Sequence, residues 1–378
     1  MSIPSRYRTA ALLAAALIVV VIATNAGFVD LQVYRYAWQA LVAGHDVYAT
    51  LPPTSAGESL PYIYPPFGAI SMAPVLALPW PVTIAVVLLL SVGALAVALY
   101  LFLGARSLVV LAVPLALAAE PVRQTLSFGQ INIWLMALVA ADCLLPKTRW
   151  PRGMLIGLAA AIKVTPAAFL LFFLVRKDYR AAGTGVATAA VVAGLGFVLA
   201  PHDSIRYWLT DPFHAGGLAN SPFAPNQSIP AELTRIGLPH SAGTLVFLVL
   251  AAAVLAATVL VMRRTAAPVA LVVNAAAALL LAPISWSHHW VWAVPALGLL
   301  AMHAWRTGTP RLWFAAGAGY LLLLIGPRLI VPTGDDLELT WTLPQHLMGN
   351  NYLLAALALL GYGVWTVSRR TAPELVKI

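Results

Sequence analysis

The sequence predicts an all-α protein that crosses a membrane many times, and three observations support this fold class. Of the 378 residues, 61% are hydrophobic and only 9% are charged, whereas about 25% of the residues of an average soluble protein are charged. Near-continuous apolar runs recur along the chain, and many of them are about 18–22 residues long, which is enough for a helix to span a bilayer. The alternating segments of about ten residues that are typical of outer-membrane β-barrels do not occur.

The first apolar run covers residues 9–26 and follows Arg6 and Arg8. Basic residues gather at the cytoplasmic ends of membrane spans, so we expect this span to run outward. A cleaved signal peptide ends in a small-residue cleavage site; none is evident here, and we expect the span to be retained. The same positive-inside bias explains the net charge of +9, which therefore does not indicate nucleic-acid binding.

The first external loop is expected over residues 27–65, and it begins with an amphipathic helix over 31–42. One face of this helix carries its apolar and aromatic residues: Tyr34, Ala37, Trp38 and Leu41. Tyr and Trp favour the lipid headgroup region, so the pattern predicts a helix lying flat on the membrane surface. Asp30 precedes the helix and could either cap it or, with a pKa raised by partial burial, serve as a general base.

Four apolar stretches follow this loop: 66–79, 82–103, 108–119 and 130–145. The loop before these stretches is expected outside and the basic residues at 147–152 should lie inside, so an odd number of stretches must cross. One of the four therefore does not cross, and the candidates are the two shortest, 66–79 and 108–119. Residues 153–175 have basic residues at both ends and an expected helix break at 163–166, where Pro166 disfavours helix in the preceding residue. This pattern predicts a re-entrant pair of half-helices, which membranes tolerate where protein surrounds them.

The remaining chain alternates between apolar runs and polar ends, and six more spans are expected over 182–200, 243–262, 267–284, 290–304, 312–331 and 351–368. Two further external loops separate some of them, at 201–242 and 332–350. The total is about twelve crossings with both termini in the cytoplasm. With no linker and no soluble segment, residues 1–378 are expected to form a single transmembrane domain.

Polar residues that could carry chemistry gather on the external side: Asp30, Tyr34, Tyr64, Gln130, Asn132, Lys163, Asn226, Gln227, His288 and His289. The cytoplasmic loops are short and hold mostly basic anchors. An active site is therefore expected to open outward, where no nucleotide pool exists.

Lys163 lies in a strongly apolar stretch, where a charge is costly and a functional role is the default expectation. It could act as a point charge for a phosphate or place its amine at the membrane surface as an ordinary anchor. His288 and His289 are adjacent, which suits chelation poorly. We expect them to contact a lipid phosphate or hydroxyls, or to pack beside the neighbouring tryptophans.

The amide side chains allow two interpretations. Asn226-Gln227-Ser228 matches a glycosylation sequon, but its amides could bind sugar hydroxyls or form a turn. Gln130 and Asn132 could contact substrate or join two spans. The acidic cluster at 335–338 is expected to be a solvated loop. Without an Asp-x-Asp motif, and with Cys143 as the single cysteine, neither a metal site nor a disulfide is expected.

Seven motifs occur in order: Phe28–Tyr34, Gly44–Tyr48, Tyr64–Phe67, Phe128–Asn132, Gly157–Pro166, Asn226–Ser228 and Pro283–His289. Together they resemble the polyprenol-phosphate-mannose-dependent α-(1→2)-mannosyltransferases of actinobacteria. These are GT-C-type membrane glycosyltransferases that build phosphatidylinositol mannosides and lipomannan. The resemblance covers residues 20–300.

This resemblance implies an enzyme of the plasma (inner) membrane that uses polyprenyl-phosphate-mannose as donor and a mannosylated phosphatidylinositol or lipoglycan as acceptor, on the outer face. Asp30 matches the family's catalytic aspartate and would deprotonate the acceptor hydroxyl. Lys163 and His288 or His289 could stabilise the leaving phosphate. Enzymes of this type generally need no metal, and no cofactor is expected.

Three alternatives stay open. A related transferase for another lipid-linked sugar, such as arabinofuranose, would share these motifs. A flippase for a lipid-linked sugar would share the cationic cavity, but such transporters more often show internal repeats and symmetric broken helices. A non-catalytic scaffold would not explain why the unusual polar residues gather on one face.

Overall fold

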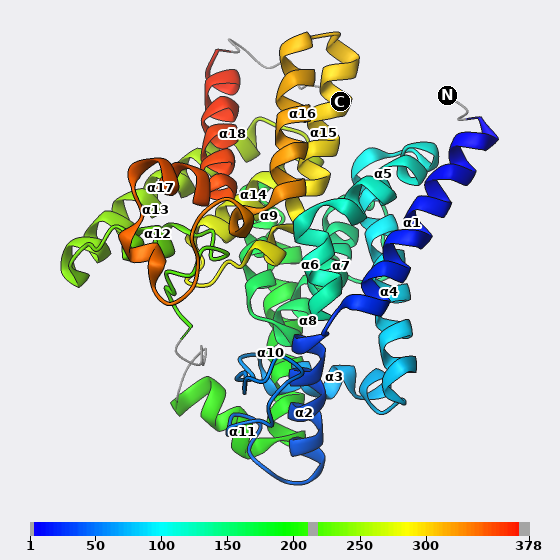
Figure 1. Ribbon diagram of the computed structural model, residues 1–378, viewed down its shortest axis with the longest axis vertical. Helices are drawn as coiled ribbons and strands as arrows, with labels where there is room; N and C mark the ends of the chain where they lie inside the picture. The colour runs from blue at the N-terminus through cyan, green and yellow to red at the C-terminus, as the bar shows by residue number, and fades with distance from the viewer. Residues whose placement is uncertain (1–3, 211–217, 370–378) are drawn as a thin grey trace. The chain divides into compact units, whose positions relative to one another are not determined.

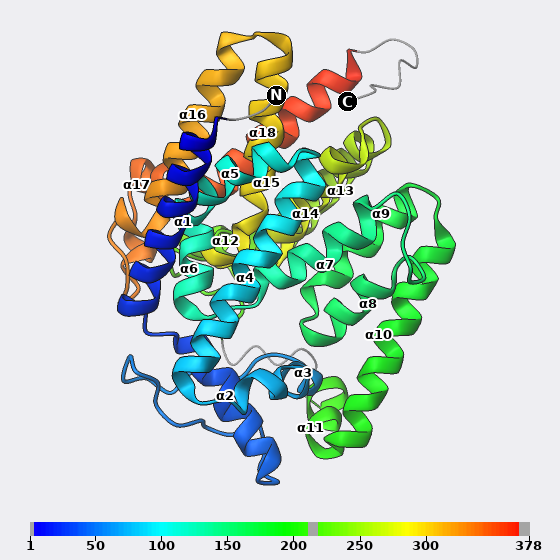
Figure 2. The same ribbon diagram turned by 90° about the vertical axis from the view of Figure 1, so that its right-hand side faces the viewer.

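A computed structural model describes residues 4–210 and 218–369, so part of the predicted loop 201–242 and the last nine residues lie outside the described chain. Within the described ranges the regular structure is helical, as predicted, and the one β-bridge is an isolated pair of residues. The chain divides into two compact units (Figures 1 and 2). The first comprises Met1–Leu117, Arg123–Leu170 and Asp178–Gly217, and the second comprises Ala118–Val122, Leu171–Lys177 and Leu218–Ile378.

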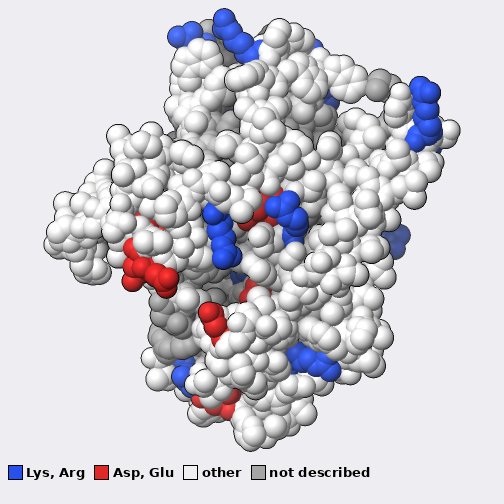
Figure 3. Space-filling view, in the orientation of Figure 1, with Lys and Arg blue, Asp and Glu red and all other residues white. Residues whose placement is uncertain are grey.

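Five described helices are long and apolar enough to cross a membrane: α1 (Ser5–Asn25), α4 (Trp80–Leu103), α10 (Tyr179–Leu199), α13 (His240–Arg263) and α18 (Asn351–Ser368). A sixth candidate arises if α5 (Arg106–Ala118) and α6 (Glu120–Phe128), which meet at a bend of 71°, count as one span. Charged side chains are sparse on the face shown in Figure 3, as expected for a membrane protein. The prediction of about twelve crossings includes shorter segments and stays a prediction.

The shorter apolar helices are α3 (Pro66–Leu76), α7 (Asn132–Leu144), α14 (Ala267–Leu281), α16 (Pro310–Ile325) and the segment Thr165–Val175. They coincide with apolar stretches that the sequence marked as spans or half-helices. In the first unit α4 and α7 run side by side in both ribbon views (Figures 1 and 2).

The predicted amphipathic helix exists as α2 (Val29–Val42), and the protein covers part of its apolar face, where Trp38 and Leu41 stay partly exposed. Four of its side chains are buried: Leu31, Val33, Tyr34 and Ala37. The residue before the helix, Phe28, has a φ of +50° and donates its backbone N–H to the carbonyl of Ser127 at 3.0 Å. Asp30 makes no capping bond, because the N-cap position belongs to Phe28. The interpretation of Asp30 as a helix cap is therefore wrong.

Close backbone contact joins α8 (Met154–Ile162) to α10 in the first unit. Gly153, with a φ of +97°, precedes α8, and a Cβ there would lie 1.9 Å from the carbonyl oxygen of Ala181. Asp142 of α7 is buried and accepts hydrogen bonds from the N–H groups of Gly153 and Ile156, both at 3.0 Å, and from the indole of Trp150 at 3.1 Å. This carboxylate satisfies amide groups at the start of α8 that have no partner inside the helix.

The helix break predicted at 163–166 is confirmed. Helix α8 ends at Ile162, and Lys163 has an extended backbone with φ −148° and ψ 125°. A 3₁₀ turn, η1 (Thr165–Phe169), and α9 (Leu170–Val175) follow. Because its backbone is extended, Lys163 leaves the path of the helix. The re-entrant course of the segment in the membrane stays a prediction.

The first unit ends with two short helices, α11 (Pro201–Ile205) and the π-helical η2 (Arg206–Thr210). In the second unit α13 packs against α14 and α18, and α15 packs against α16. The second unit also contains α12 (Ile229–Arg235), η3 (Ser287–Trp292), α15 (Ala293–Thr307), η4 (Pro327–Leu329), η5 (Leu337–Thr340) and α17 (Leu343–Gly349).

The acidic cluster at 335–338 is only partly a solvated loop. Asp335 and Asp336 are exposed, but Glu338 is buried. One of its carboxylate oxygens accepts the N–H of Ala224 at 3.0 Å and that of Gly334 at 3.1 Å. For Glu338 the expectation of a solvated side chain is wrong, because its negative charge satisfies two backbone donors.

Candidate functional site

Six of the ten predicted site residues lie together in the first unit: Asp30, Tyr34, Tyr64, Gln130, Asn132 and Lys163. They come from α2, the loop before α3, the turn between α6 and α7, and the break after α8. The turn depends on Gly129, whose φ is +72° and where a Cβ would lie 2.5 Å from the Cβ of Leu31. Only glycine allows this close approach of the turn to α2.

The side chain of Gln130 is the centre of this cluster. Its amide nitrogen donates to one carboxylate oxygen of Asp30, at 2.9 Å, and to the hydroxyl oxygen of Tyr64, also at 2.9 Å. Its carbonyl oxygen accepts the hydroxyl of Tyr34 at 3.4 Å. One buried amide thus connects the carboxylate to two tyrosines from different segments.

Asp30 is half-buried, and only its Oδ2 atom accepts a hydrogen bond from a described residue. Burial raises the pKa of this carboxyl from 3.8 to about 6, although the Gln130 hydrogen bond and the charge of Lys163 both act to lower it. A carboxylate with this pKa is ionised at neutral pH and is more basic than an ordinary aspartate. The Oδ1 atom is therefore suited to accept a proton from a hydroxyl group.

Lys163 supplies a buried positive charge to the same cluster; only 5% of the residue is exposed. Its amine donates to the side-chain oxygen of Asn132 at 3.0 Å and lies 4.9 Å from the centre of the Tyr64 ring, a cation–π contact. Tyr64 in turn stacks on Tyr34, with ring centres 5.1 Å apart. The cluster thus combines a carboxylate of raised pKa with a cation that could hold an anionic group.

A neighbouring group of residues supports this cluster and was not predicted from the sequence. Asp46 forms an ion pair with Arg206, and the Val47 N–H donates to the carboxylate of Asp203 at 3.2 Å. The hydroxyl of Tyr48 donates to the backbone carbonyl of Tyr64 at 2.8 Å. These contacts anchor the loop between α2 and α3, and the motif Gly44–Tyr48 was the signal in the sequence that could have identified them.

This neighbouring group also has the geometry that comes closest to a metal site among the described residues. One ligand atom from each of Asp46, His202 and Asp203 lies within 4.8 Å of the others. The Arg206 guanidinium, however, already pairs with Asp46. A cation already neutralises this carboxylate, so we assign no metal to the group.

The other four predicted residues lie in the second unit, and two of them are fully buried amides. The Asn226 nitrogen donates to the carbonyls of Ser221 and Pro283, at 3.1 and 3.3 Å, and its oxygen accepts the Ser285 N–H at 2.8 Å. The Gln227 nitrogen donates to two backbone carbonyls, at 2.7 and 2.6 Å, and its oxygen accepts the Tyr352 N–H. These amides join loops of the protein, and binding a sugar would require them to give up those bonds.

His288 and His289 lie on η3, and their rings meet edge to face with centres 4.7 Å apart. The preceding residue, Ser287, donates its hydroxyl to the carboxylate of Glu120 at 2.7 Å. The other Glu120 oxygen accepts the hydroxyl of Tyr352 at 2.8 Å. Glu120, which the sequence did not single out, therefore fixes the start of the histidine segment in the second unit.

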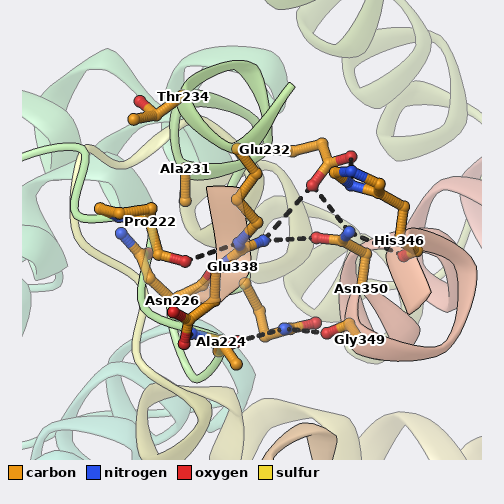
Figure 4. Close-up of polar contacts among 12 residues, drawn as sticks. Pro222, Ala224, Asn226, Ala231, Glu232, Thr234, Glu338, His346, Gly349 and Asn350 are labelled. Atoms are coloured by element: carbon orange, nitrogen blue, oxygen red, sulfur yellow. Dashed lines mark hydrogen bonds and ion pairs between the residues drawn. The ribbon is translucent and has the colours of Figure 1, made fainter. Parts of the chain in front are cut away.

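Arg235 makes a network of buried polar contacts in the second unit, and Figure 4 labels four of its partners: Pro222, Asn226, Glu232 and Asn350. Only 2% of it is exposed, and its guanidinium donates to the carbonyls of Pro222, Phe223 and Asn226, at 2.7, 3.0 and 2.5 Å, and to the side chain of Asn350 at 2.5 Å. It also pairs with Glu232 at 3.5 Å. This network joins α12 to two of the predicted external loops.

Comparison with known proteins gives consistent results. The model of glycosyltransferase family 87 matches residues 62–285. The polyprenol-phosphate-mannose-dependent alpha-(1-2)-phosphatidylinositol mannoside mannosyltransferase of Mycobacterium tuberculosis H37Rv is 32% identical over 374 residues, which cover 92% of this chain and 86% of the relative. The protein of the same name from Mycolicibacterium smegmatis is 36% identical over 366 residues, or 88% and 82% of the two chains.

A third relative differs in the acceptor that its name states. The polyprenol-phosphate-mannose-dependent alpha-(1-2)-phosphatidylinositol pentamannoside mannosyltransferase of Mycolicibacterium smegmatis is 32% identical over 366 residues, covering 89% of this chain and 85% of the relative. No solved structure shows a significant match to the chain.

Proposed function

Because the chain belongs to glycosyltransferase family 87, we propose that it moves mannose from a polyprenyl-phosphate-mannose donor to a mannosylated lipid or glycan, forming an α-(1→2) linkage. The names of the relatives support this donor and this linkage. Their names differ in the acceptor, a phosphatidylinositol mannoside or its pentamannoside. The acceptor proposed for this chain is therefore the class that they share, a mannosylated phosphatidylinositol.

The reaction is a single displacement at the anomeric carbon. The acceptor oxygen forms a bond to that carbon while the bond to the donor phosphate oxygen breaks, which converts a β-linked donor into an α-mannoside. The acceptor proton passes to Asp30, and polyprenyl phosphate leaves with the bonding electron pair. The observation that carries this proposal is the half-buried carboxylate of Asp30, with one oxygen tied to Gln130 and a pKa of about 6.

Lys163 is the proposed partner of the leaving phosphate, since it is the cation that lies in the Asp30 cluster. A positive charge close to a departing phosphate stabilises the charge that develops in the transition state. Tyr34, Tyr64 and Asn132 would then shape the substrate site around this pair. The proposal that His288 or His289 also binds the donor phosphate rests on the sequence alone.

The topology proposed for the chain is the one that the sequence indicates. It has about twelve crossings, both termini in the cytoplasm and the site on the outer face, within one transmembrane domain. Helix α2 would lie at the membrane surface directly after the first span. Its buried residues would then face the rest of the protein. Orientation can be tested by labelling cysteines introduced at Ala43 and Thr309 in intact cells, since only Ala43 should react.

The first experiment measures transfer of labelled mannose from polyprenyl-phosphate-mannose to phosphatidylinositol mannosides in membranes that carry the wild type or Asp30→Asn. Loss of a general base should lower the rate by about two to four orders of magnitude. Asp335→Asn is the matched control, because Asp335 is exposed and should keep full activity.

Three outcomes would count against parts of the proposal. Full activity in Asp30→Asn would remove Asp30 as the base. Transfer from a lipid-linked arabinofuranose but not from the mannose donor would replace the donor. Movement of the donor across vesicles without release of polyprenyl phosphate would identify a flippase.

A further inference from the structure

We propose that Gln130 is a positioning residue for the base: it holds one oxygen of Asp30 so that the other is presented to the acceptor hydroxyl. This inference rests on the proposed function and specifies how the base is oriented. It also differs from the expectation that Gln130 binds substrate. Four features of the structure support it.

The first is the direction of the hydrogen bond. An ionised carboxylate only accepts hydrogen bonds, so the amide must turn its nitrogen toward Asp30. The same nitrogen donates its second hydrogen to Tyr64, at the 2.9 Å that also separates it from Asp30. The charge of the carboxylate and the two hydrogen bonds of the nitrogen thus fix the same orientation of the amide.

The second feature is that the amide is used inside the protein. Both hydrogens of the Gln130 nitrogen are donated, its oxygen accepts from Tyr34, and only 3% of the residue is exposed. Little of this side chain is left to contact a sugar. Asp30, in contrast, is half-buried and has an oxygen without a hydrogen bond from any described residue.

The third feature is that the two backbones are joined. The N–H of Gln130 donates to the Thr125 carbonyl at 2.9 Å, which fixes the turn after α6. The N–H of Phe28 donates to the Ser127 carbonyl at 3.0 Å, which ties the start of α2 to the end of the same helix. The base and the amide are therefore mounted on segments that are held directly together.

The fourth feature is electrostatic. A donor aimed at a carboxylate favours its charged form, so Gln130 opposes the effect of burial on Asp30. The titratable groups that face Asp30 are Lys163 from the break after α8, Tyr64 from the loop before α3 and Tyr34 from its own helix. Burial raises the pKa of both tyrosines, so they stay neutral and Lys163 is the charged neighbour.

The test is the pH dependence of kcat/KM for mannosyl transfer in Gln130→Met, which keeps the length of the side chain but removes its hydrogen bonds. The acidic limb of the profile should move upward by about one to two pH units, the shift expected for losing a hydrogen bond to a charged group. In Gln130→Glu a second carboxylate faces Asp30, and the upward shift should be larger.

Gln124→Met is the matched control. Gln124 lies on α6, six residues earlier, and makes no hydrogen bond through its side chain among the described residues. Its variant should keep the wild-type profile. The amount of folded protein in each membrane preparation, measured by binding to a tag, separates misfolding from an altered base.

Infrared spectra provide a second measurement that needs no substrate. The difference between a protein and its Asp30→Asn variant reports the protonation of the Asp30 carboxyl, and this titration should move upward in Gln130→Met. An unmoved titration in folded protein would overturn the proposal, as would an unchanged pH profile with a raised KM for the acceptor, which would indicate a direct substrate contact. If the wild type transfers no mannose but the Asp30 titration still moves upward in Gln130→Met, the proposed function would be removed and the positioning role kept.

Discussion

Replacing Arg235 by methionine should destabilise the second unit strongly, because its guanidinium is a buried donor for several groups. Four hydrogen bonds would be lost, to the carbonyls of Pro222, Phe223 and Asn226 and to the side chain of Asn350. The Phe223 carbonyl keeps a second donor, the Asn226 N–H at 2.8 Å. The other three acceptors would have no remaining donor among the described residues.

The expected loss follows from these acceptors. A buried acceptor without a donor costs about 1–3 kcal/mol. The Asn226 carbonyl and the Asn350 side chain are buried and the Pro222 carbonyl is partly buried, so the loss should be at least about 2 kcal/mol. The Glu232 carboxylate adds little to this sum, since it keeps His346 at 2.8 Å and the Asn350 amide at 2.7 Å.

The measurement is the free energy of unfolding of detergent-solubilised protein titrated with sodium dodecyl sulfate. Arg328→Met is the matched control: Arg328 is exposed and lies 5.9 Å from the centre of the Phe223 ring. An exposed cation–π contact is worth about 0.5–1 kcal/mol, so this variant should lose no more than that. Equal unfolding free energies for the two variants would refute the reasoning, because water would then satisfy the freed acceptors.

Three further predictions use other features of the chain. Asp142→Asn should lower the free energy of unfolding in the same titration by about 1–3 kcal/mol, since an amide cannot accept all three hydrogen bonds of the carboxylate. Gly153→Ala should lower the free energy of unfolding by more than about 1 kcal/mol, because Gly153 has a positive φ and a Cβ there would lie 1.9 Å from the Ala181 carbonyl oxygen. Gly183→Ala, where a Cβ would meet open space, should be neutral or stabilising in the same measurement. In the wild type kcat/KM for mannosyl transfer should fall about tenfold per pH unit below about pH 6, because Asp30 loses the charge that a base needs as the pH falls through its pKa of about 6; a flat profile down to pH 5 would contradict this.

The elements that were predictable from the sequence have strong local signals. Long apolar runs placed the spanning helices, and Pro166 marked the break beside Lys163. An isolated charge beside or within an apolar stretch is costly, and for this reason the sequence by itself assigns Lys163 and Asp30 to a site.

The remaining features depend on contacts between residues far apart in the chain. Gln130 bonds to Asp30 across 100 residues, and that contact depends on the positive φ of Gly129. The amides of Asn226 and Gln227 face inward, and nothing local distinguishes a buried amide from an exposed one. Arg235 and Glu338 are ordinary charged residues in a loop sequence, and only their tertiary partners show that they are internal.

The six gathered residues of the candidate site all belong to the first unit. Asp30, proposed to remove the proton, and Lys163, proposed to hold the departing phosphate, are thus both encoded within the first 210 residues. Mutagenesis confined to one section of the gene, from the codon of Asp30 to that of Lys163, would therefore sample all six positions together.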